Sequence, residues 1–273
     1  MRIDAEVIHR RIAELLSGRQ RFVVATIVET KGSTPQTAGA KMIIHSDGSF
    51  DFTIGGGTFE AEVIQDALSV LPKNSTGIRE YRLTKTDLGM YCQGLVRVML
   101  ETYCPRPQML ILGGGHVGQA LSRITAATGI FRVVVADDRK EYANRKKHPA
   151  ADQVVLTDRD YQKGIPDIDA DTYVVIVTRC HTTDKVIIKN LALKNPAYIG
   201  LIGSKPKIKQ FHRELLDEGV SSCFLESIYA PIGISIGGKE PAEVALSILA
   251  QVVQVKNTNS ARATLALQKA IIK

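Results

Sequence analysis

Apolar and polar positions along the second half of the chain predict strands and helices in turn. The apolar run Met109–Leu112 precedes the amphipathic segment Val117–Thr128, and a second apolar run covers Arg132–Ala136. The later runs Tyr173–Thr178 and Tyr198–Ile202 are each followed by a segment with helical spacing. Alternating strands and helices build a parallel sheet that helices cover on both faces. This half is therefore predicted to be a Rossmann-like, doubly wound α/β domain.

The first half has a different pattern, which predicts a small α+β domain. A helix is expected between Asp4 and Gly18, and β-rich runs then predict strands, two of them joined by the hairpin turn Asp47-Gly48. The prolines on either side of Arg106 mark a short stiff linker. We predict three regions: an α+β domain over 1–104, a Rossmann-type domain over 105–256 and a C-terminal tail over 257–273.

Composition and charge exclude some classes of function. No stretch reaches the roughly 20 apolar residues that span a bilayer, and no signal-peptide core is visible, so a cytoplasmic protein without a membrane partner is expected. The net charge of +7 suits an anionic small molecule or an acidic partner. No nucleic-acid-binding motif accompanies it, so no nucleic-acid partner is expected. The four cysteines form no CxxC pair, which indicates free thiols and argues against a zinc site.

A glycine loop between the first strand and helix of the second half has the spacing of a dinucleotide-binding turn. Gly113 permits the turn, Gly115 lets a phosphate approach the backbone, and Gly118 lets helix and strand pack closely. The helix N-terminus offers free N–H groups to an anion. Asp137 ends the next strand, where an acidic residue is expected to hold a ribose hydroxyl, and Arg139 is a candidate phosphate contact. The loop predicts a nucleotide or pterin-phosphate site, with a vestigial site as the alternative.

Two later strand ends place further polar groups at the same edge of the predicted sheet. Arg179 and His181 follow the most buried strand, and Gly203 and Ser204 precede a helix that Ser204 is suited to cap. Ligands bind at the carboxyl ends of parallel strands, so we expect these residues to contact a charged ligand. For His181 the alternative is a helix-cap residue satisfied by the backbone.

The first half offers two loops that expose backbone N–H groups, Gly32-Ser33 and Gly55-Gly56-Gly57. Such loops form anion nests, although turns that need a positive φ explain them equally well. Cys92 lies in a short glycine-containing loop, where a cysteine is a reactive thiol, a metal ligand or inert.

Motifs in a fixed order along the chain carry a family resemblance. They are Gly32-Ser33-Thr34-Pro35, Ile54-Gly55-Gly56-Gly57 with Glu60, the Cys92 loop, the glycine loop with His116, Asp137-Asp138-Arg139, Thr178-Arg179-Cys180-His181, Tyr198–Ser204 and Ala230–Gly233. Together they resemble the XdhC/CoxI family, the accessory proteins of xanthine dehydrogenase and related molybdenum hydroxylases. Two positions depart from the family pattern, since Gln93 and Cys180 stand where glycine is usual.

The resemblance implies a molybdenum-cofactor chaperone without turnover of its own. Such a protein would bind molybdopterin, present it to a cysteine desulfurase for exchange of an oxo for a sulfido ligand, and pass it to the apo-hydroxylase. The residues named above would bind the cofactor, with no catalytic residue among them, and the protein's metal ligands stay open. A homodimer is the default expectation.

Two alternatives remain open. The first is an NAD(P)-dependent oxidoreductase, in which Asp137 would favour NAD and either His116 or His181 would donate a proton. The second is a non-catalytic nucleotide sensor that regulates a partner. The glycine loop supports all three hypotheses, and only the family motifs favour the chaperone.

Overall fold

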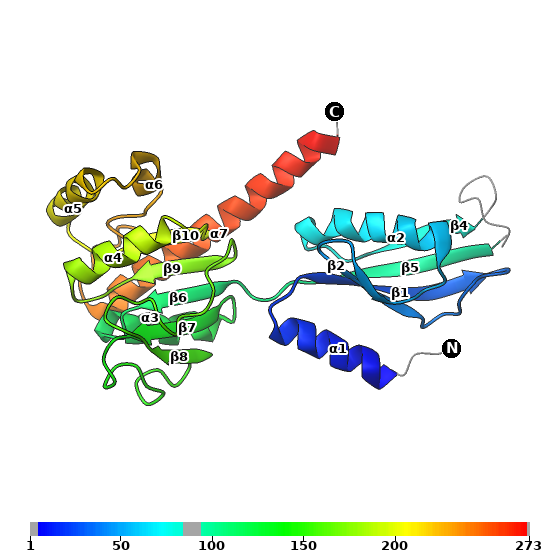
Figure 1. Cartoon of the computed structure of the whole chain (residues 1–273), viewed down its shortest axis with the longest axis horizontal. Coiled ribbons are helices and arrows are strands. Elements are labelled where there is room, and N and C mark those ends of the chain that lie inside the picture. The colour runs from blue at the N-terminus through cyan, green and yellow to red at the C-terminus, as the bar shows by residue number, and fades with distance from the viewer. Residues whose placement is uncertain (1–4, 84–93, 272–273) are drawn as a thin grey trace. The chain divides into compact units, whose positions relative to one another are not determined.

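The structure is a computed structural model that describes residues 5–83 and 94–271, with side chains through residue 258. The chain divides into an N-terminal unit, Met1–Pro105, and a C-terminal unit, Arg106–Lys273 (Figure 1). None of the helices in these described ranges has the length and apolar character of a membrane span.

The N-terminal unit contains one antiparallel sheet with a helix on each face. Its elements are α1 (Ala5–Ser17), β1 (Phe22–Lys31), β2 (Lys41–His45), β3 (Phe50–Phe52), α2 (Gly57–Val70), the 3-10 turn η1 (Leu71–Lys73), β4 (Gly77–Leu83) and β5 (Gly94–Tyr103). The strand order is β3-β2-β1-β5-β4. Residues of α2 join the larger core with one face of β1, β2 and β5, while Leu15 of α1 packs against Phe22, Val24 and Ile43 on the other face. This is the small α+β architecture that the sequence predicts.

The C-terminal unit contains a five-stranded parallel sheet in the order β10-β9-β6-β7-β8. Its elements are β6 (Gln108–Leu112), α3 (His116–Thr128), β7 (Arg132–Asp137), β8 (Gln153–Leu156), β9 (Thr172–Ile176), α4 (His181–Leu191), β10 (Tyr198–Leu201), α5 (Lys205–Asp217), α6 (Ser222–Glu226) and α7 (Pro241–Ile271). The first strand lies in the middle, and the order reverses around it, so the glycine loop that follows β6 lies at the switch point.

Side chains of the central strand alternate between two cores, which explains why the whole strand is apolar. Met109 and Ile111 pack with α3 and α7, whereas Leu110 and Leu112 pack with α4 and α5. Each face of the sheet is therefore covered by helices (Figure 1). The predicted doubly wound fold is confirmed.

The last helix corrects one prediction. The apolar pattern predicts a helix that ends at Val255 and a separate tail over 257–273, but α7 continues to Ile271. No glycine or proline interrupts residues 256–271, and alanine, leucine, glutamine and lysine favour helix there. The short helix α6 was not predicted, because five residues show no helical period.

Candidate functional site

The glycine loop is shaped by close contacts at two of its glycines. Gly113 has φ 116°, and a β-carbon there would lie 2.5 Å from the carbonyl oxygen of Val177. A β-carbon on Gly118 would lie 2.0 Å from the carbonyl oxygen of Gly113. The turn and the close helix–strand packing predicted for these two residues are thus confirmed.

Gly115 differs, because the space in front of it is open. It is the N-cap of α3, and no heavy atom lies within 4 Å of a β-carbon built there. No side chain of the described residues caps the helix, and the next residue, His116, is exposed. The first N–H groups of α3 are therefore accessible at this edge, as an anion site requires.

Asp137 ends β7 directly beside the loop and is fully buried. Its Oδ2 accepts a 2.7 Å hydrogen bond from the N–H of Gly114, and Arg139 donates to both carboxylate oxygens at 2.9 Å. Burial alone would raise the pKa of Asp137, but the bonds from Arg139 and Gly114 outweigh it and lower the pKa. The carboxylate predicted for a ribose hydroxyl is thus paired with the glycine loop and Arg139 in this structure.

His148 supports the loop from behind and was missed as a site residue. In the sequence it stands only within a run of basic residues, but its side chain is 1% exposed. Its Nδ1 lies 3.1 Å from Oγ of Ser122, while Nε2 faces Gly114 and makes no regular hydrogen bond within the described residues. Burial lowers the pKa of His148. A neutral imidazole therefore fills the space that any β-carbon on Gly114 would need.

The turn after β9 brings Arg179, Cys180 and His181 to the same edge. Cys180 is the N-cap of α4, and the N–H groups of Thr183 and then Thr182 lower the pKa of its thiol. The side chains of Arg179 and His181 are largely exposed, and Nη2 of Arg179 lies 3.7 Å from Oδ2 of Asp138. The charged groups predicted at this strand end are therefore accessible to a ligand.

Asp184 in the first turn of α4 is buried beneath these residues. It accepts a 2.5 Å hydrogen bond from Oγ1 of Thr178, and its Oδ2 lies 3.7 Å from Nδ1 of His181. Burial raises the pKa of Asp184 to about 6. The charge of this carboxylate is therefore sensitive to pH near neutrality.

The turn after β10 completes the edge. Ser204 is the N-cap of α5, as predicted, and its side chain makes no capping hydrogen bond within the described chain. Gly203 packs tightly, since a β-carbon there would lie 2.8 Å from Cδ1 of Ile208. Together with Gly115 and Cys180, Ser204 gives three helix N-termini without a side-chain cap at the carboxyl edge of one sheet. This arrangement favours a ligand with more than one negatively charged or acceptor group.

A pocket of about 230 Å³ lies at this edge, and it collects charge from three segments. It is lined by Asp138, Arg139, Arg159, Tyr161, Thr178, Arg179, Cys180 and Thr183. Arg159 and Tyr161 were missed, because they lie in the irregular crossover after β8, where no periodic pattern marks a site. A segment joining two parallel strands passes the carboxyl edge of the first, and that topology is the signal that could have found them.

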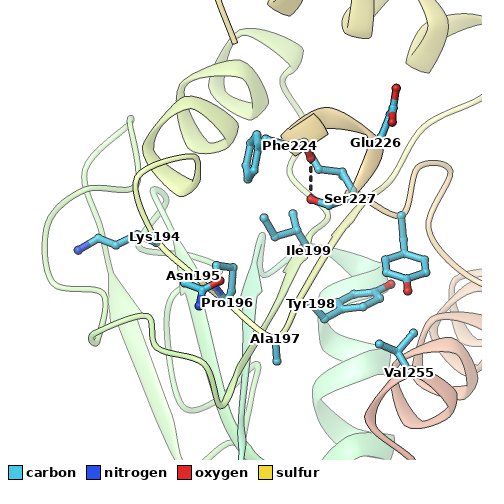
Figure 2. A pocket seen from close by; sticks show the side chains of 12 residues that line it. Lys194, Asn195, Pro196, Ala197, Tyr198, Ile199, Phe224, Glu226, Ser227 and Val255 are labelled. Carbon is cyan, nitrogen blue, oxygen red and sulfur yellow. Dashed lines mark hydrogen bonds between the residues drawn. The ribbon is translucent and has the colours of Figure 1, made fainter. Parts of the chain in front are cut away.

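A second pocket, of about 440 Å³, lies at the opposite end of β10 (Figure 2). Residues 194–199 form one side of it, and residues 224–229 with Val255 form the other. The ring of Tyr229 stacks on Tyr198 with centroids 4.8 Å apart, and Tyr198 donates a 2.6 Å hydrogen bond to Gln251. This pocket is at the amino end of the strand, so it is separate from the glycine loop.

The N-terminal unit brings its predicted loops together. A β-carbon on Gly55 would lie 2.5 Å from Cγ of Pro35, and one on Gly94 would lie 2.2 Å from the carbonyl oxygen of Ser33. Gly32, Gly55, Gly56 and Gly57 all have positive φ, as the alternative explanation of turns required. The loop that contains Gly32 and Ser33 is therefore in contact with Gly55 at one end of the sheet.

Glu60, in the first turn of α2, closes the Gly55–Gly57 loop from within. Its Oε1 accepts hydrogen bonds from Oγ1 of Thr53, from the N–H of Ile54 at 2.9 Å and from the N–H of Gly55 at 3.2 Å. This buried carboxylate occupies the N–H groups at the start of the predicted nest. Cys92 lies outside the described residues, and the described part of the chain has no cluster of three metal-ligating side chains.

Family comparisons match both units. Residues 109–252 match the XdhC Rossmann domain, and residues 15–82 match the XdhC and CoxI family. The first match alone covers more than half of the chain. The chain belongs to the XdhC and CoxI family.

Individual relatives of this XdhC family chain carry different names. The uncharacterized protein YqeB of Escherichia coli is 32% identical over 86% of the chain, which spans only 44% of YqeB. A protein of Bacillus subtilis named as a probable xanthine dehydrogenase subunit is 23% identical and is covered to 97%, with 91% of the chain aligned. The molybdenum cofactor insertion chaperone PaoD of E. coli is 25% identical over 93% of the chain and 89% of PaoD.

A solved structure supports the fold of this XdhC family member. The crystal structure of a xanthine dehydrogenase from Bacillus halodurans aligns with 91% of the chain and 95% of its own length, with a TM-score of 0.50 and 22% identity. The family match places the glycine loop, Asp137, Arg179 and Ser204 inside the XdhC Rossmann domain.

Proposed function

We propose that this protein is an accessory factor that binds molybdenum cofactor and supports its sulfuration and insertion into a xanthine dehydrogenase-type molybdenum hydroxylase. The names of the relatives support an accessory role in molybdenum enzyme maturation. The observation that carries the proposal is the set of three helix N-termini without side-chain caps at one edge of the Rossmann sheet.

The residues at this edge suit molybdopterin as a cargo. Molybdopterin carries a phosphate, and free N–H groups with nearby arginines are the donors that a phosphate requires. In this proposal the N-terminus of α3 at Gly115 binds an anionic group of the cargo, and Arg179 and Ser204 contribute from the neighbouring turns. The hydroxylase chemistry belongs to the molybdenum centre, and this protein binds, shields and delivers it.

The proposal includes the partners. A cysteine desulfurase would supply the sulfido ligand, and an apo-hydroxylase would receive the cofactor. Delivery requires that binding is reversible, and a site built from backbone N–H groups and exposed arginines at a surface suits such an exchange. We further propose a homodimer as the working state, because symmetric dimers are the commonest soluble assemblies.

A copurification experiment tests the proposal. The full chain would be isolated anaerobically from cells that make molybdenum cofactor, and bound pterin would be measured by fluorescence after oxidation. We expect retained molybdopterin, and we expect the loaded protein to raise hydroxylase activity only where sulfuration with a cysteine desulfurase is needed. Protein that carries no pterin under these conditions, or that stimulates a fully sulfurated hydroxylase equally, would contradict the proposal.

A further inference from the structure

The 230 Å³ pocket beside the glycine loop has arginines that no acidic group neutralises completely. Arg139 is committed to Asp137, as described above. Asp138 lies 3.7 Å from both Arg139 and Arg179, so two guanidinium groups share its charge. Arg159 makes no ion pair with any described residue. Subtracting Asp138 from Arg159 and Arg179 leaves one net positive charge in the pocket.

The N-terminus of α4 adds to this charge. The helix spans 11 residues, and its N-cap Cys180 and first-turn residue Thr183 both line the pocket. A helix N-terminus contributes roughly half a positive charge. Two guanidinium groups and a helix N-terminus around one small cavity are suited to a compact anion that accepts several hydrogen bonds.

The buried position of Asp137 narrows the choice of ligand group. Its two oxygens bind Gly114 and Arg139, so this carboxylate is engaged where it would otherwise accept hydrogen bonds from a ribose diol. The remaining groups of the pocket are mainly donors. We propose that the pocket formed by Arg159, Arg179 and the N-terminus of α4 binds a phosphoryl group and recognises its ligand by this group instead of by a ribose diol.

This inference deepens the proposed function and rests on it in one respect, because it names the group by which this edge of the sheet would hold its cargo. The phosphoryl group could belong to a pterin phosphate or to a nucleotide. Both sources present the same doubly charged monoester, and the experiment has to separate them.

Cys180 provides a local readout of occupancy. Its sulfur lines the pocket, whereas Cys223 is exposed on α6 and serves as an internal reference. The full chain would be treated with iodoacetamide, and alkylation of each cysteine would be followed by peptide mass spectrometry. We expect AMP and inorganic phosphate to slow the alkylation of Cys180, adenosine to leave it unchanged, and Cys223 to react equally in all samples.

Arginine variants test which side chains bind the phosphoryl group. For Arg159→Ala and Arg179→Ala we expect about 10-fold more AMP for half-maximal protection, measured against each variant's own rate without ligand. Arg123→Ala, which removes an exposed arginine of α3 outside the pocket, is the matched control and should behave as wild type. Equal protection by adenosine, no protection by any phosphate compound, or an equal loss in the Arg123 variant would overturn the inference.

A second pair of probes separates the sources. The oxidised pterin phosphate obtained from molybdopterin would be compared with its dephosphorylated form and with AMP. Stronger protection by the pterin phosphate assigns the pocket to the cofactor, and stronger protection by AMP assigns it to a nucleotide; both support phosphoryl recognition. A protein that copurifies with molybdopterin but shows no phosphate-dependent protection of Cys180 would refute this inference and leave the proposed function standing.

Discussion

Two glycine loops of this protein lead into a helix, and they differ in what binds their backbone N–H groups. In the N-terminal unit, Glu60 accepts hydrogen bonds from Ile54 and Gly55 and closes the loop with a buried carboxylate. In the C-terminal unit, Asp137 binds only Gly114 of the loop, and the space in front of Gly115 stays open. A glycine-rich loop before a helix therefore becomes a ligand site only where the protein's own acidic side chains leave donors accessible.

The largest effect is expected at Gly118, where the C-terminal loop packs against its own helix. A β-carbon would lie 2.0 Å from the carbonyl oxygen of Gly113, so backbone must move, and we expect Gly118→Ala to lose about 4 kcal/mol of unfolding free energy or to fail to fold. Gly115→Ala is the matched control, because its φ of −67° and open surroundings accept a methyl group. Urea unfolding of both variants gives the comparison, and equal losses would contradict the assigned difference.

A smaller loss is expected when the carboxylate of the N-terminal loop is removed. Glu60→Ala leaves the hydroxyl of Thr53 and two backbone N–H groups without their acceptor, which should cost about 3 kcal/mol. Glu60→Gln keeps an acceptor oxygen and should cost about 1 kcal/mol. Glu62→Ala, on the exposed face of α2, is the control. Hydrogen exchange of residues 53–60 measures the effect locally, and a loop equally protected in Glu60→Ala would show that the carboxylate does not hold it.

These two loops also show how far the sequence could predict the site. The turn at Gly113 and the packing at Gly118 follow from glycine spacing between an apolar strand and a helix, and both were predicted. The role of Glu60 was not predicted, although an acidic residue in the first turn after a glycine loop is a signal for it. Both loops looked alike in sequence, because accessibility depends on contacts between side chains and backbone that no periodic pattern records.

The irregular segments on either side of β8 explain the other omissions. His148 and Arg159 lie in segments without helical or strand spacing, and the fold alone places one behind the glycine loop and the other in the arginine pocket. The basic run that contains His148 resembles a solvated surface, yet burial of the apolar neighbours takes the imidazole inside. Residues in irregular segments acquire their surroundings from tertiary packing, so they were missed.

The smallest expected effect depends on pH and concerns Asp184 beneath the C-terminal site. Its pKa of about 6 lies above the ordinary 3.8, so the ionised form destabilises the folded state. The cost is absent below about pH 4, grows as the pH rises through 6, and reaches at most about 3 kcal/mol above it. Asp184→Asn should therefore match wild type near pH 4 and be more stable at pH 8.

Thermal unfolding across this pH range measures the difference. The control is Asp217→Asn, which changes an exposed carboxylate at the end of α5 and should show no gain at pH 8. A stability difference between Asp184→Asn and wild type that does not vary with pH would show that burial does not govern this carboxylate.

The central claim is that the open glycine loop, and not the closed one, holds an anionic cargo. The most direct test compares molybdopterin copurified anaerobically with the wild-type chain and with Gly115→Asp. Aspartate is a favourable N-cap residue, so the helix should remain stable while a negative charge occupies the open space. The account predicts an unchanged Tm and at least about 10-fold less retained pterin, the loss expected for a displaced charge-assisted contact. Equal retention of pterin by the two proteins would contradict it.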